Sequence, residues 1–153
     1  MRSNLQRALT DAGPLYDEDF FEWTRRNAEL LRAGRLEQVD IEHIAEEIED
    51  MGKRDLRELD NRARVLLMHL LKWHMQPTNR SRSWERTIAS QRMGIEQVMA
   101  DSRSLRPRFR RNLDANYAKA IHLAAIETGV PLSEFPSGCP FTVAQILDPG
   151  FLP

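Results

Sequence analysis

The apolar residues of the chain recur every three or four positions over long stretches, which is the spacing of one face of an α-helix. The longest stretch predicts a helix over residues 41–76, which Asp40 can cap and which Pro77 ends. Its stripe consists of Ile41, Ile44, Ile48, Met51, Asp55, Leu59, Ala63, Leu66, Leu70 and Trp73, with Asp55 as the polar exception. Such a helix would be about 54 Å long, so we expect a bend, for which Gly52 is the local candidate.

The two halves of this predicted helix differ in kind. The first half is apolar on one side, with acidic residues such as Glu42 and Glu49 off the stripe. The second half, over residues 65–73, is apolar nearly all round. An all-round apolar helix is typical of the centre of a bundle, so we expect the second half to be surrounded by other helices.

Three further helices follow from start and stop signals. One spans about residues 18–33, with Asp17 as its N-cap and Gly34 after its end. Another starts at Ser83 and runs to about residue 101. The last begins after Ser102 or Ser104, carries Pro107 in its first turn and ends at Gly129.

The C-terminal residues 130–153 have a different composition. They contain five of the eight prolines and nine Val, Leu, Ile and Phe residues, so they predict neither a long helix nor a disordered tail. We expect an ordered apolar strap that packs on the bundle, with a short helix after Thr142. The fold class is therefore all-α, a single antiparallel helical bundle over residues 1–153, in which residues 1–15 are expected to be flexible.

Charge is distributed unevenly, although the net charge is only −1. Residues 11–60 carry 16 acidic and 7 basic side chains, whereas residues 61–111 carry 12 basic and 3 acidic ones. Two opposed blocks of this kind can neutralise each other within one fold or across a dimer, and an acidic face also suits a basic protein partner.

Composition excludes several classes of protein. One cysteine, Cys139, allows no intramolecular disulfide, which favours a reducing compartment, and no apolar run has the length of a signal peptide or a membrane span. We therefore expect a cytoplasmic protein that does not enter a membrane. No nucleophile elbow, phosphate-binding loop or dinucleotide turn is present, so the sequence favours a protein that is not an enzyme and implies no cofactor.

Three arginines between residues 80 and 86 suggest an anion site. Arg80, Arg82, Ser83 and Arg86 surround a predicted helix start, where free N–H groups and the helix dipole favour phosphate or carboxylate. The alternative interpretation is that these arginines pair with the acidic block, which the matched charges make available.

A metal site is the other candidate, on the first half of the long helix. His43 has Glu46 and Glu47 three and four residues later, so that the three side chains share one side. Two-metal bundle centres need more ligands than these, and a solvated acidic face is the alternative interpretation.

The remaining candidates are structural or weak. We expect three tryptophans on the predicted helices to be core residues: Trp23, Trp73 and Trp84. No histidine follows Cys139 in the sequence, so we interpret this cysteine as a small buried apolar residue rather than as a nucleophile. The arginines between residues 103 and 111 could contact nucleic acid, but only Phe109 is aromatic there and the isoelectric point is near 6.4. His69 lies beside Lys72 in the apolar helix, a setting that disfavours its charged form.

Six segments of the chain together resemble a bacterial family known as domain of unknown function twenty-nine. They are residues 16–24, residues 40–52, His69–Trp73 with Gln76 and Pro77, Arg80–Trp84 with Thr87 and Ile88, Phe135–Pro140, and the ending Gln145–Pro153. The resemblance implies a small, all-helical, free-standing intracellular protein with no established activity. A link to toxin and antitoxin gene neighbourhoods, suggested for small families of this kind, comes with it as an association.

The sequence thus favours a non-enzymatic bacterial interaction protein that binds a protein partner or a second copy through its opposed charge blocks. A bundle with a small anion or metal site is the alternative from a different class. Binding of nucleic acid through the arginines is a third, weaker interpretation.

Overall fold

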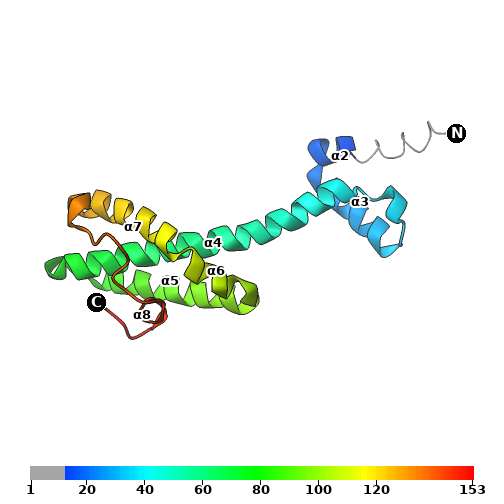
Figure 1. The fold of residues 1–153 in the computed structure, drawn as a ribbon. Helices are drawn as coiled ribbons and strands as arrows, with labels where there is room; N and C mark the ends of the chain where they lie inside the picture. The colour runs from blue at the N-terminus through cyan, green and yellow to red at the C-terminus, as the bar shows by residue number, and fades with distance from the viewer. Residues whose placement is uncertain (1–12) are drawn as a thin grey trace. The chain divides into compact units, whose positions relative to one another are not determined.

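The computed structural model describes residues 13–153. These residues form helices and connections with no β-strand, which confirms the all-α prediction (Figure 1). The α-helices are α2 (Gly13–Glu18), α3 (Phe20–Arg32), α4 (Ile41–Met75), α5 (Arg82–Asp101), α6 (Arg106–Arg111), α7 (Leu113–Thr128) and α8 (Val143–Leu147). The short 3-10 helices are η1 (Leu36–Gln38), η2 (Pro77–Asn79), η3 (Arg103–Leu105) and η4 (Leu132–Glu134).

The contacts divide the chain into two compact units at Gly52, within α4. Unit 1 contains α2, α3, η1 and the first three turns of α4, and unit 2 contains residues 53–153. Of the residues 1–15 that we expected to be flexible, residues 1–12 lie outside the described part of the chain, whereas residues 13–15 belong to α2.

In unit 1, the predicted N-cap of the first helix is wrong. Asp17 is not an N-cap, because it lies within α2; the cap of α3 is Asp19, whose carboxylate accepts a hydrogen bond from the Glu22 backbone N–H at 3.0 Å. At the other end Gly34 has φ +69°, the left-handed conformation that glycine adopts without strain, so it ends the helix as predicted.

The long helix is confirmed almost to the residue. It runs from Ile41 to Met75, with Asp40 before it accepting a hydrogen bond from the His43 backbone N–H, and it continues without a break through Gly52. Its stripe is buried from Leu59 to Leu70, but Ile41, Ile48 and Met51 are exposed.

Unit 2 is a bundle in which α5 runs antiparallel to α4 and α7 runs parallel to it (Figure 1). Its core contains Leu59, Ala63, Leu66, Leu67, Met68, Leu70 and Leu71 of α4, Ile88, Ile95 and Met99 of α5, and Tyr117, Ala120 and Ala124 of α7. The three alanines in this set allow close approach of the helices. The second half of α4 is therefore surrounded, as its all-round apolar pattern predicted.

The third predicted helix starts slightly earlier than expected and crosses α4 closely at one position. Ser81, rather than a residue after it, is the N-cap of α5 and accepts a hydrogen bond from the Trp84 backbone N–H. A Cβ at Gly94 would lie 2.3 Å from an Arg62 guanidinium nitrogen, so the missing side chain leaves room for that group.

The fourth predicted helix is broken in two at Asn112. Asn112 has φ −91° and ψ 0°, which is outside the helical region, and its side-chain amide donates to the Asp60 carboxylate on α4. The backbone hydrogen bonds continue through this position, since the Asn112 N–H donates to the Arg108 carbonyl and the Asn112 carbonyl accepts from the Asn116 N–H, both at 2.9 Å. The predicted stop is confirmed, because Gly129 has φ +72°.

The C-terminal strap is ordered and packs on unit 2 as predicted. Phe135, Phe141 and Ile146 enter the core of the bundle. Thr142 begins α8 with a capping box, in which its hydroxyl accepts from the Gln145 N–H and the Gln145 side chain accepts from the Thr142 N–H.

Within the described residues, no helix combines the length and the apolar character that crossing a membrane requires.

Candidate interaction surface

Asp40 organises unit 1 at the point where the chain enters α4. Its carboxylate accepts hydrogen bonds from the Trp23 indole N–H at 2.9 Å and from the His43 Nδ1 at 2.6 Å. The buried side chain of Asn27 accepts from the Asp40 backbone N–H and donates to the Trp23 carbonyl. These bonds fix α3 against the first turn of α4. They contribute to a general result, that no buried side-chain polar atom of the described residues is without a partner.

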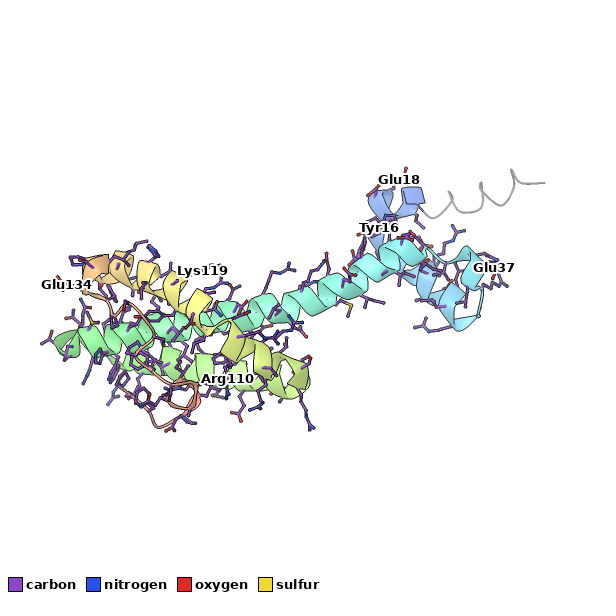
Figure 2. All side chains as sticks on the ribbon, in the orientation of Figure 1. Tyr16, Glu18, Glu37, Arg110, Lys119 and Glu134 are labelled. Atoms are coloured by element: carbon purple, nitrogen blue, oxygen red, sulfur yellow. The ribbon has the colours of Figure 1, made fainter. Side chains whose placement is uncertain are left out.

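An aromatic stack covers one side of this network. The ring of Tyr16, which Figure 2 labels, lies parallel to the His43 ring at 4.0 Å between centroids, and the Tyr16 hydroxyl donates to Glu47 at 2.7 Å. The hydrogen bond to Glu47 is the main reason why the pKa of Tyr16 rises to about 12. His43 and Glu47 are thus used to attach α2 to α4.

The hydrogen bond to Asp40 raises the pKa of His43 above its ordinary value of 6.5. Burial works against ionisation of Asp40, but the bonds from Trp23 and His43 outweigh it and lower the pKa of that carboxyl. The His43 contribution to stability is therefore complete below pH 6.5 and is lost as the pH rises through the raised pKa, whereas the Asp40 contribution is lost in acid.

We expect an NMR titration of the His43 ring to give a pKa above 6.5 and Asp40→Asn to return it toward that value. The amide of this variant keeps an oxygen for the Trp23 N–H, so indole fluorescence should confirm that the unit still folds. Asp114→Asn in unit 2 is the control and should leave the titration unchanged. A His43 pKa at or below 6.5 in the unaltered protein would contradict the proposed pairing.

A shallow apolar groove lies between α3 and α4 in unit 1 and has a volume of about 190 Å³. Its lining consists of Trp23, Thr24, Asn27, Ala28 and Leu31 from α3 and Ile44, Glu47 and Ile48 from α4. Beside it, the exposed fractions of Ile41, Ile48 and Met51 are 61%, 63% and 61%. The same stripe that builds the core of unit 2 therefore continues into unit 1 as an open face.

The surroundings of the groove are strongly acidic. Residues 13–52 carry 12 acidic and 4 basic side chains, a net charge of −8. Some of this charge is used within α3, where Arg25 forms ion pairs with Glu22 and Glu29. A surface that combines exposed isoleucine and methionine with net negative charge is unusual for a solvated helix and is typical of a binding face.

The structure separates the residues of the predicted metal site. His43 turns its Nδ1 to Asp40, Glu47 accepts from Tyr16, and Glu46 is exposed. Over residues 13–153, no three His, Cys, Asp or Glu side chains are grouped as a bound metal ion would require.

The structure brings part of the predicted anion site together. Arg82, Ser83 and Arg86 line one open surface pocket with Glu85 and Ala89. Arg80 is directed elsewhere: its guanidinium donates to the carbonyls of Trp73 at 3.0 Å and Pro153 at 3.1 Å. It thus binds the C-terminal end of α4, where the helix dipole favours a cation. Anion binding by the other three residues stays a prediction.

The second arginine group lies along η3 and α6, and its side chains are exposed. Phe109, the aromatic residue among them, is 2% exposed and belongs to the core. It therefore offers no ring on which a base could stack, which is what single-stranded nucleic acid needs.

Sequence reasoning missed two buried cations. Arg92 of α5 is 5% exposed and donates to the carbonyls of Ile146 and Phe151 at 2.8 Å each, with longer bonds to those of Gln145 and Pro149. Burial lowers the pKa of its guanidinium from the ordinary value. In the sequence Arg92 is one arginine among many, and the available signal was its helical spacing from the apolar Ile88, Ile95 and Met99.

Lys72 is the other buried cation, at 7% exposure. Its ammonium group lies 2.5 Å from a Glu127 carboxylate oxygen and 4.5 Å from the Trp84 ring centre. It joins α4 to both α5 and α7. Trp84, which we expected as a core residue, is half-buried beside this cation and does not belong to the core.

The other structural candidates pack as expected. Trp23 is buried in unit 1, and Trp73 packs against the core of unit 2 beneath the Arg80 guanidinium. Cys139 is half-buried against the same core, and burial raises the pKa of its thiol, which makes it a poor nucleophile. Burial also lowers the pKa of His69, whose Nδ1 lies 2.9 Å from the Val65 carbonyl.

The fold and the surface together define a small all-helical protein whose N-terminal unit leaves a two-helix groove open. Residues 15–152 match the family described as Domain of unknown function DUF29, and the chain belongs to this family. This confirms the resemblance carried by its motifs. No curated protein and no solved structure matches the chain.

Proposed function

We propose that this protein is a non-enzymatic interaction protein whose unit 1 presents the open α3–α4 face to a protein partner. The main support for the proposal is a difference in burial between the two halves of α4. The stripe of α4 is buried in unit 2 but exposed at Ile41, Ile48 and Met51. Fully burying an exposed side chain of this size contributes about 1.5–3 kcal/mol, so covering these three residues would favour association and offset part of its entropic cost.

Two further features support binding rather than catalysis. The histidine and carboxylates of unit 1 are engaged in holding α2 and α3 on α4, through Asp40, His43 and Glu47. The exposed apolar residues are flanked by acidic side chains, and complementary charge speeds encounter with a basic partner and rejects acidic ones.

The proposal is tested by site-specific photo-cross-linking in cells of the source organism. A photoreactive phenylalanine analogue replaces Met51 of unit 1 or, as the matched control, Met93 of α5, which is similarly exposed at 72%. We expect one dominant protein adduct from position 51 and none of that mass from position 93.

Identical adduct patterns at both positions, or no adduct at position 51, would overturn the proposal. The purified protein is assayed in parallel for metal and phosphate. One equivalent of either per chain, without an adduct at position 51, would instead favour the alternative of a small ligand site.

A further inference from the structure

We propose that the α3–α4 groove takes a basic amphipathic helix of another protein, which completes a three-helix bundle with α3 and α4. This rests on the proposed function and adds the chemistry of the partner. The shape of the groove is the first argument. It is bounded by two helices that are fixed to each other through Asp40, and its apolar lining includes Ala28, Leu31 and Ile44. Two packed helices leave such a groove on each side, and a third helix fills it at the ordinary interaxial distance of about 8–10 Å.

The spacing of the exposed residues gives the second argument. Ile41, Ile44, Ile48 and Met51 follow one another by three, four and three positions, which is the seam of a helix that packs against another helix. Leu31 of α3 is 46% exposed on the opposite wall of the groove. A partner helix with apolar residues at i, i+3, i+4 and i+7 would contact both walls along this length.

The negative charge of unit 1 indicates which residues flank the apolar face of the partner helix. Glu42 follows Ile41 of the exposed stripe by one position and is itself exposed. Together with the net charge of −8 on residues 13–52, it favours Lys or Arg beside the apolar face of the partner. An acidic or neutral helix would gain the apolar contact without this attraction.

The chain's own cationic helices are poor occupants, which argues against a second copy. α5 buries Ile88, Ile95 and Met99 in the core of unit 2, and α6 buries Phe109. Neither helix therefore has a comparable apolar face left to place in the groove of another molecule. The net negative charge of unit 1 disfavours pairing of its open face with the same face of a second copy, so we assign the occupant to a different protein.

The test uses the full chain and three synthetic 21-residue peptides. The first carries leucine at the helical positions named above and lysine on the flanks; the second replaces each lysine with glutamate; the third scrambles the order of the first. We expect saturable binding of the lysine peptide in calorimetry, weakening with added salt, and at least tenfold weaker binding of the other two.

Two single substitutions locate the binding. Ile48→Glu and Leu31→Glu should each weaken the lysine peptide about tenfold or more, because each places a charge in the contact. Ile126→Glu, at an 80% exposed position on α7, is the matched control and should have no effect. All three positions are exposed in the free protein, so circular dichroism should show an unchanged helix content.

Three outcomes would overturn the inference. One is the absence of saturable binding, and another is equal binding to the variants and the unaltered chain. The third is concentration-dependent dimerisation in sedimentation that Ile48→Glu abolishes, which would assign the groove to a second copy. If the peptides fail but a photo-cross-link forms at position 51, only the chemistry of the partner is wrong and the proposed function stands.

Discussion

Replacing Arg92 with methionine is expected to detach the C-terminal strap and to lower the stability of unit 2 by about 3 kcal/mol, or roughly 12–24 °C in Tm. The guanidinium donates to carbonyl oxygens of Gln145, Ile146, Pro149 and Phe151 from a position that is 5% exposed. Methionine fills most of the volume and removes a buried charge, which offsets part of the loss. It offers no donor, so the carbonyls of Ile146, Pro149 and Phe151 lose the bond from Arg92, and this cost is the larger one.

The prediction is checked by thermal unfolding and by hydrogen exchange over the strap. Amides between residues 141 and 151 should lose protection before those of α4. Arg86→Met, on the same helix at an exposed position, is the matched control and should change stability by no more than about 0.5 kcal/mol. Equal effects of the two substitutions would show that the strap is held by its apolar residues alone.

Arg92 also shows what limits prediction from this sequence. The helices follow from local signals: periodicity, Gly34 and Gly129 as stops, and Asp40 as a cap, and all of these are found in the structure. The role of Arg92 depends on carbonyls more than fifty residues away, which no local pattern contains.

The errors in the helix boundaries have the same origin. Asp17 and Asp19 are equivalent as caps by composition, and only the helical conformation of α2 decides between them. Asn112, where the predicted helix divides, donates a hydrogen bond to Asp60, 52 residues earlier in the chain. Local propensity cannot register a side chain that arrives from another helix.

The candidate site, too, can be predicted from the sequence only in part. The sequence is enough to recognise the family resemblance, the acidic character of the first fifty residues and the group of arginines after Pro77. The sequence could not show that Arg80 is taken by the end of α4, or that His43 faces Asp40 rather than Glu46. Above all, a stripe of apolar residues in a sequence does not show whether another segment packs against it.

Leu66→Ala and Ile48→Ala test that last point directly, because the two residues belong to one sequence stripe and differ in burial. Leu66 is fully buried in unit 2, so its truncation should cost about 3 kcal/mol through lost contacts and a residual cavity. Ile48 is 63% exposed, and alanine is the better helix former, so Ile48→Ala should change stability by no more than about 0.5 kcal/mol.

Urea unfolding at several protein concentrations measures both effects. A small cost at Ile48 together with weaker photo-cross-linking from position 51 would mean that this isoleucine serves binding rather than folding. A cost at Ile48 close to that at Leu66 would mean that the open face is covered in the isolated protein. If that cost grew with protein concentration, the cover would be a second copy, because association stabilises the folded chain by mass action. The stability of these two variants therefore decides whether the first three turns of α4 are covered in the isolated protein, before any partner is known.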